Sequence, residues 1–193
     1  GLLLKGSWDD GWREYEWRWK VQGLSLKPRD FPQPQWAGGN IAGKTILLHP
    51  EQGYGDAIQF ARYASRVAAQ GARVFMEMHP PLLPLMQGLE GVHQWVRKGD
   101  ALPPFDVHCP FMSLPLALDT RLDTIPADVP YLRADPARVQ RWRDRLGAPR
   151  GLRSGRAWNG NEQHVSDRRR SLPLATLMAH LPDGPPLYPE GGG

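Results

Sequence analysis

The chain has 193 residues, of which 40% are hydrophobic and 23% charged, and its formal net charge is +4. This length and balance are typical of a globular protein with one well-packed core. No apolar run reaches the ~18 residues that a membrane span needs. The single cysteine, Cys109, excludes an internal disulfide and fits a reducing, cytoplasmic compartment.

The positive charge is concentrated between residues 131 and 170, which contain eleven arginines and four acidic residues. Such a segment forms either a solvated helix face or a contact surface for phosphate groups. Aromatic residues are not interleaved with these arginines as they are on a single-stranded nucleic-acid platform. We therefore expect no nucleic-acid partner.

Residues 1–20 have helical spacing, because Trp8, Trp12, Tyr15 and Trp19 recur on one face of a helix after a turn at Gly6. Two short helices with a tight turn are typical of a helical-repeat unit, so we interpret the segment as the remnant of a repeat array. The alternative is a plain N-terminal helix packed on the domain. Without neighbouring repeats these aromatic residues would form an exposed apolar face, which predicts a possible homodimer.

Residues 21–43, which are rich in proline and glycine, are predicted to be a linker. Hydrophobic runs then alternate with helical patterns through residues 44–181, which we predict to form one Rossmann-like lobe. Strands are expected at 44–49, 72–78, 92–96, 105–109 and 152–158, and helices at 56–70, 80–88, 111–118, 136–146 and 173–180. This alternation predicts an α/β fold, a Rossmann-like parallel sheet with helices on both faces. Residues 182–193 have no periodicity and are predicted to be an irregular tail.

The stretch from His49 to Asp56 joins the first strand to the first helix. Gly53 and Gly55 are expected to let the backbone turn sharply and to leave the loop surface unobstructed. Asp56 is expected in the first turn of the helix, at the edge of the sheet where open α/β proteins carry their chemistry. There it acts either in chemistry or only as a helix cap. No third glycine follows, which excludes a dinucleotide fingerprint, and we expect neither a cofactor nor a metal.

Several motifs together resemble bacterial tetratricopeptide-repeat proteins that carry a glycosyltransferase domain. The residues that carry the resemblance are Trp8-x3-Trp12-x2-Tyr15-Glu16-Trp17-Arg18, then Phe31-Pro32 and Trp36, then His49-x-Glu51-Gln52-Gly53-x-Gly55-Asp56-x2-Gln59-Phe60-x-Arg62-Tyr63, then Phe105-Asp106-x-His108-Cys109-Pro110 and Ser113-Leu114-Pro115-Leu116, and finally Trp158-x-Gly160-Asn161-x2-His164-x2-Asp167-Arg168-x-Arg170-Ser171-x-Pro173-Leu174. The resemblance spans residues 2–174. The catalytic domain of that family is related to the heptosyltransferases and, more distantly, to the protein O-GlcNAc transferases.

The resemblance implies a two-lobed GT-B fold, of which this chain would be the N-terminal, acceptor-side lobe. In heptosyltransferase relatives a Gly-Asp pair after the first strand supplies a possible base, and Gly55-Asp56 matches that pair. We expect substrate binding by His49, Glu51, Gln52, Gly53, Gly55, Gln59, His164, Asp167 and Arg168. The alternatives are a strand-end histidine with a structural hydrogen bond for His49 and a solvated loop for the segment with Asp167 and Arg168. The acceptor would be a sugar or a protein, and a nucleotide-sugar donor would bind only if a second lobe were supplied, because the chain ends before a donor lobe.

Two other functions remain open from the residues alone. One is a non-catalytic binding module on the same fold. The other is a small-substrate hydrolase that uses Asp56 and His49 in one cleft.

Overall fold

The computed structural model describes residues 1–21, 26–148, 158 and 171–180. These belong to two compact units, Gly1–Arg141 and Trp142–Gly193. Helix α6 (Pro136–Leu146) extends from the first unit into the second, and helix α7 (Leu174–Ala179) belongs to the second. Both helices confirm the predictions at 136–146 and 173–180. Residues 152–157 of the predicted last strand and the predicted tail at 182–193 lie outside the described residues.

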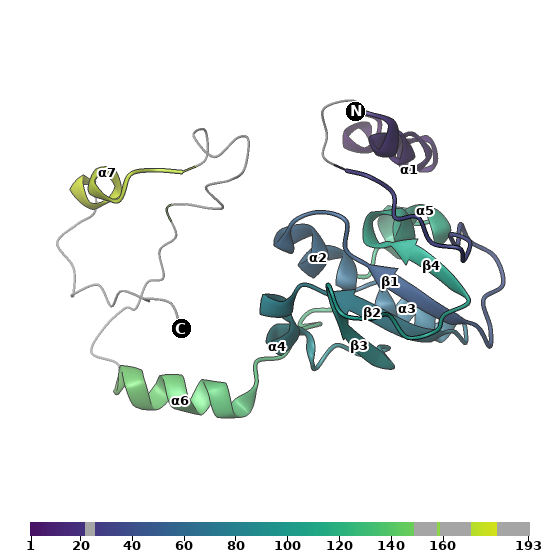
Figure 1. Cartoon of the computed structure of the whole chain (residues 1–193). Helices are drawn as coiled ribbons and strands as arrows, with labels where there is room; N and C mark the ends of the chain where they lie inside the picture. Colours follow the sequence, from purple (N-terminus) through teal and green to yellow (C-terminus); the bar gives the residue numbers. More distant parts are fainter. Residues whose placement is uncertain (22–25, 149–157, 159–170, 181–193) are drawn as a thin grey trace. The chain divides into compact units, whose positions relative to one another are not determined.

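A four-stranded parallel sheet forms the centre of the first unit (Figure 1). Its strands are β1 (Thr45–His49), β2 (Arg73–Met78), β3 (Gln94–Arg97) and β4 (Val107–Pro110), in the order β3-β2-β1-β4. Ile46 of β1 lies between Val74 of β2 and Val107 of β4. Helices pack around this sheet, which confirms the α/β, Rossmann-like class.

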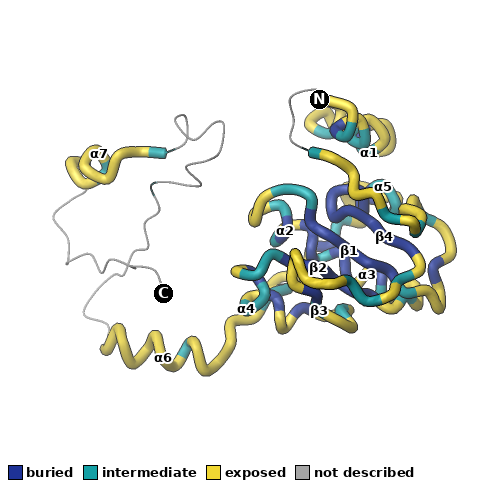
Figure 2. Tube along the Cα trace, viewed as in Figure 1, coloured by how far each residue is buried: buried dark blue, intermediate teal, exposed yellow. Residues whose placement is uncertain are grey.

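One face of the sheet packs on helices and carries the main core, seen as the dark blue interior of Figure 2. The helices of this unit are α2 (Tyr54–Ala61), α3 (Ala64–Ala69), α4 (Leu83–Met86) and α5 (Leu114–Ala117), with the 3-10 helices η3 (Pro80–Leu82), η4 (Phe111–Ser113) and η5 (Leu122–Thr124). Ile46, Leu48 and Met76 point into this core, where they meet side chains of α2, α3 and α4. Burial of these apolar side chains is the main stabilising contribution to the unit.

The predicted helix at 56–70 is two helices, α2 and α3, separated by a turn at Arg62 and Tyr63. Tyr63 is 5% exposed and its ring stacks on Phe60, with 6.1 Å between the ring centroids. The apolar pattern continues through the turn, so the pattern did not predict the break.

The other face of the sheet is covered by the extended segment 29–36. The Phe31 ring contacts the rings of His49 and His108, with centroids 5.6 and 4.8 Å apart. Gln35 forms a single parallel bridge with His108 at the outer edge of β4. Trp36 and Ile41 are buried in the main core, so the segment predicted as a linker contributes to the packing of the lobe.

The N-terminal helices also belong to the first unit and pack on its α5 side. They are the 3-10 helix η1 (Leu3–Lys5), α1 (Trp8–Tyr15) and the 3-10 helix η2 (Glu16–Lys20). Trp12 Nε1 donates a hydrogen bond of 2.9 Å to the Thr120 carbonyl oxygen, and the Tyr15 hydroxyl lies 3.7 Å from the Met112 sulfur.

The prediction that Trp12, Tyr15 and Trp19 form an exposed apolar face is therefore wrong, because all three are partly buried. A homodimer stays a prediction that no longer rests on them. The packing fits the plain N-terminal helix, and a repeat remnant is not confirmed.

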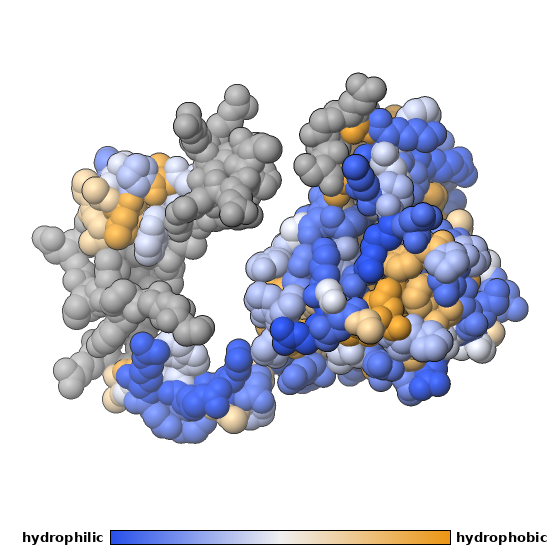
Figure 3. Space-filling view, viewed as in Figure 1, coloured by the Kyte–Doolittle hydropathy of each residue, from blue (hydrophilic) through white to orange (hydrophobic). Residues whose placement is uncertain are grey.

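Hydrophilic side chains cover most of the visible face of the first unit, and apolar residues gather in one patch over the strands (Figure 3). Of the helices within the described ranges, none has the length and apolar character to cross a membrane.

Candidate functional site

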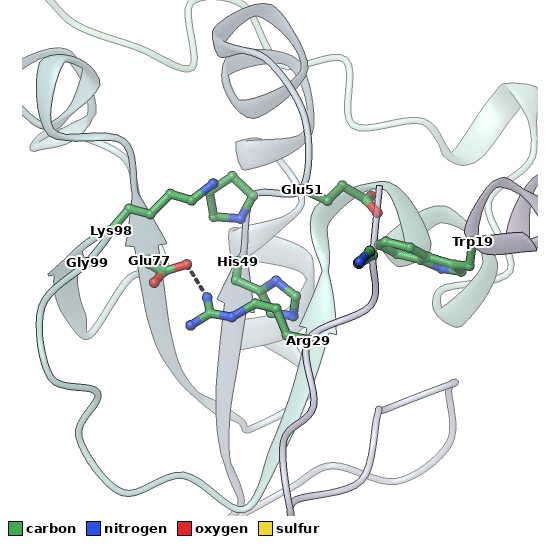
Figure 4. A pocket seen from close by; sticks show the side chains of 9 residues that line it. Trp19, Arg29, His49, Glu51, Glu77, Lys98 and Gly99 are labelled. Atoms are coloured by element: carbon green, nitrogen blue, oxygen red, sulfur yellow. Dashed lines mark hydrogen bonds and ion pairs between the residues drawn. The ribbon is translucent and has the colours of Figure 1, made fainter. Parts of the chain in front are cut away.

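A pocket of about 360 Å³ opens at the carboxyl edge of the sheet (Figure 4). It is lined by residues at the ends of β1, β2 and β3 and by residues that precede the sheet in the chain. The lining residues are Trp19, Lys27, Arg29, His49, Pro50, Glu51, Glu77, Lys98 and Gly99. The carboxyl edge is where ligands bind in open α/β sheets, because the loops after parallel strands meet there.

Cationic side chains surround the pocket. Arg29 forms an ion pair of 2.5 Å with Glu77, whose side chain is 1% exposed. Lys27 and Lys98 form no ion pair with any carboxylate in the described ranges. In Figure 4 Lys98 extends from the segment after β3 towards the end of β1. The pocket therefore has more positive than negative charge.

His49 lies at the end of β1 beside His108 of β4. The two rings are buried, and His49 Nε2 is 3.1 Å from His108 Nδ1. Burial, with smaller effects of His108, Arg29 and Lys98, lowers the pKa of His49 from 6.5 to about 3. Burial and Arg29 also lower the pKa of His108. Both rings are therefore neutral at pH 7 and share one hydrogen bond, while His49 Nδ1 has no partner among the described atoms.

Glu51 is held by Arg18 from the N-terminal segment. Arg18 Nε and Nη2 donate to both carboxylate oxygens of Glu51 at 2.9–3.1 Å, and the two side chains are 5% and 4% exposed. Arg18 also donates to Glu16 at 2.7 Å and to the Ser113 hydroxyl at 2.7 Å. The backbone N–H of Met112 donates to Glu51 at 3.0 Å. The Glu51 carboxylate is thus fully engaged in joining η2 to the sheet.

Burial raises the pKa of Glu51 even though the Arg18 guanidinium pulls that pKa down. Desolvation therefore opposes ionisation of this carboxyl more strongly than the ion pair favours it. Glu51 is a structural side chain at the rim of the pocket.

Asp56 caps its own helix. Its Oδ2 accepts the backbone N–H of Gly53 at 3.1 Å, so both residues belong to the capping box of α2. Asp56 is partly exposed and does not line the pocket. Gly53 has a φ of −72°, and Gly55 lies within α2 with nothing near the position of a Cβ atom. The chain therefore turns from β1 into α2 without a left-handed glycine, and the surface at Gly55 is unobstructed, as predicted.

The remaining predicted residues are dispersed. The Gln52 carbonyl oxygen lies 3.2 Å from His79 Nε2, and Gln59 is exposed on α2. His164, Asp167 and Arg168 lie outside the described residues. The structure thus brings His49 and Glu51 to one pocket, and no hydrogen bond joins His49 to Asp56 within the described part of the chain.

Sequence reasoning missed the cations of the pocket and Glu77. The acid Glu77 in the strand Val74-Phe-Met-Glu-Met78 breaks an otherwise apolar run, and that break was a usable signal. Lys27, Arg29 and Lys98 lie in loops, where charged residues are ordinary. In the described ranges no cluster of three His, Cys, Asp or Glu side chains is placed to hold a metal ion.

Comparison with known proteins gives one weak similarity. No family model matches the chain, and no solved structure matches it significantly. The chain is similar to Protein FlbA of Caulobacter vibrioides, with 24% identity over an alignment of 213 positions that covers 90% of this chain and 32% of FlbA. The chain therefore spans about a third of the length of that relative.

Proposed function

We propose that the chain is the acceptor-side lobe of a cytoplasmic glycosyltransferase that transfers a sugar from a nucleotide-sugar donor to a hydroxyl of a sugar or protein acceptor. The observation that carries the proposal is the course of the β1–α2 loop. The loop leaves the carboxyl end of β1 at the pocket and ends at Gly53, so that Asp56 lies in the first turn of α2, outside the pocket lining. The donor would bind to a second lobe outside these residues.

Asp56 would act on the acceptor. The hydroxyl oxygen forms a bond to the anomeric carbon, the bond from that carbon to the donor phosphate breaks, and the carboxylate takes the hydroxyl proton. Within the described part of the chain only Oδ2 of Asp56 is hydrogen-bonded, which leaves Oδ1 for the acceptor. The cap bond fixes the carboxylate, so little entropy is lost when the acceptor is positioned.

The test uses the natural polypeptide that contains this chain and measures release of nucleoside diphosphate from a panel of nucleotide sugars with acceptor extract. We expect Asp56→Asn to lower turnover by about 100-fold or more, because the general base is lost, while Asn still caps the helix. Asp56→Ala should also lower the free energy of unfolding by about 1 kcal/mol. Full turnover of Asp56→Asn would refute the assignment.

A non-catalytic binding module is the second candidate, favoured by the capping role that already accounts for Asp56. It predicts ligand binding by the natural polypeptide without release of nucleoside diphosphate from any donor. A hydrolase that uses Asp56 with His49 has less support, because His49 Nε2 is engaged by His108.

A further inference from the structure

The charges of the pocket do not balance. Glu77 is neutralised by Arg29, and Glu51 is neutralised by Arg18. The ammonium groups of Lys27 and Lys98 have no carboxylate partner among the described residues, although both side chains line the pocket. Two unbalanced cations at the rim of a concave site favour a ligand that carries two negative charges.

A buried polar atom in the same pocket also lacks a partner. His49 is 2% exposed and lines the pocket, and its Nδ1 forms no hydrogen bond with the described residues. The bond between His49 Nε2 and His108 Nδ1 uses one proton. His49 Nδ1 is therefore a donor in one tautomer of the pair and an acceptor in the other. A hydroxyl group can satisfy either tautomer, because it both donates and accepts.

We propose that this pocket binds a phosphorylated sugar, with the phosphate at Lys27 and Lys98 and a sugar hydroxyl at His49 Nδ1. The volume of about 360 Å³ falls within the range of small-molecule sites. Trp19 supplies an aromatic wall to the pocket, and Pro50 supplies a further apolar surface. The role of this sugar as acceptor rests on the proposed function, whereas its binding does not.

The probe is glucose 6-phosphate, titrated calorimetrically into the chain at low ionic strength, with glucose and inorganic phosphate as reference ligands. Lys98→Met should weaken binding of glucose 6-phosphate about tenfold, which corresponds to about 1.4 kcal/mol. Lys98 is exposed, so the substitution leaves the core intact. Lys44→Met is the matched control, because Lys44 is exposed and outside the pocket; it should change the affinity less than about twofold.

Three results would overturn the inference. Equal weakening by Lys98→Met and Lys44→Met would mean that only the net charge attracts the ligand. Equal affinity for inorganic phosphate and glucose 6-phosphate would mean that no sugar hydroxyl is recognised. Tighter binding of a nucleotide sugar with the same dependence on Lys98 would make the pocket a donor site. His49→Phe, which keeps an aromatic ring beside Phe31, should bring the affinity for glucose 6-phosphate down to that for inorganic phosphate.

Failure of this inference and failure of the proposed function are distinguishable. Binding of glucose 6-phosphate without nucleoside diphosphate release by the natural polypeptide would refute glycosyl transfer and keep the site. Release of nucleoside diphosphate without binding of glucose 6-phosphate to the chain would refute the phosphorylated-sugar site and keep glycosyl transfer.

Discussion

Arg18→Met should be among the most destabilising single substitutions in the first unit. The Arg18 side chain is 5% exposed and bonds to the carboxylates of Glu51 and Glu16 and to the Ser113 hydroxyl. Methionine keeps much of the apolar stem but removes every one of these donors. The Glu51 carboxylate, 4% exposed, then keeps only the backbone N–H of Met112.

Removing one partner of a buried ion pair costs about 3–5 kcal/mol, because the other charge stays buried without compensation. Here the lower part of that range applies, about 3–4 kcal/mol, since Glu16 is 25% exposed and can be hydrated. With a urea dependence of about 2 kcal/mol per molar, the midpoint of unfolding should fall by about 1.5–2 M.

The loss of stability caused by Arg18→Met should depend on pH, and the direction of this dependence follows from the pKa of Glu51. The pKa of this carboxyl is raised above 4.5 by burial, and Arg18 partly counteracts that rise. Without Arg18 the folded-state pKa rises further. A group whose pKa is higher in the folded than in the unfolded state stabilises the fold when the pH is below the unfolded-state pKa. This stabilisation is lost as the pH rises through the folded-state pKa. The destabilisation by Arg18→Met should therefore be larger at pH 8 than at pH 5.

Urea unfolding followed by tryptophan fluorescence and circular dichroism measures both effects. Arg13→Met is the control, because the Arg13–Asp10 pair on α1 is 3.6 Å long with side chains 70% and 68% exposed. It should cost less than about 0.5 kcal/mol. The double variant Arg18→Met/Glu51→Met should be more stable than the sum of the single losses predicts. Strict additivity, or a loss by Arg18→Met as small as that by Arg13→Met, would refute the reasoning.

Two further predictions concern stability. Gly91→Ala should cost about 2–4 kcal/mol, because a Cβ atom would lie 2.7 Å from Ser65 Cα and φ is +85°. Gly43→Ala, with φ +75° and open space, should cost only about 1–2 kcal/mol; equal midpoints in thermal unfolding would contradict the close approach. His49 has a lowered pKa of about 3, so its contribution is lost as the pH falls from 6.5 towards 3, by about 2–3 kcal/mol at pH 4.5. An imidazole titration midpoint near 6.5 in NMR spectra of the folded chain would disprove this.

The parallel sheet was predictable because its strands are short apolar runs bounded by glycine and proline. Gly71 ends the helix before β2, and Pro110 closes β4. Alternation of such runs with helical patterns leaves few topologies. The break at Arg62 and Tyr63 was not predictable, because a buried Tyr63 continues the apolar periodicity of a single helix.

The candidate site was only partly predictable from the loop motif. His49 was placed correctly at the end of a strand, and its carboxyl-edge position follows from the parallel topology. Lys27 and Lys98 are 71 positions apart and have no local pattern. Only the order β3-β2-β1 brings the end of β3 close enough for Lys98 to share a pocket with His49. Tertiary placement of this kind leaves no periodic signal in sequence.

The β1–α2 loop joins two tasks that sequence alone could not separate. Glu51 and Asp56 are both acids in one short motif, yet Glu51 is buried against Arg18, whereas Asp56 is partly exposed and caps α2. Because Trp19 follows Arg18 directly and lines the pocket, the ion pair also fixes one wall of the candidate site. The N-terminal helices therefore belong to the site as well as to the fold, and any change that releases Arg18 acts on stability and on the pocket together.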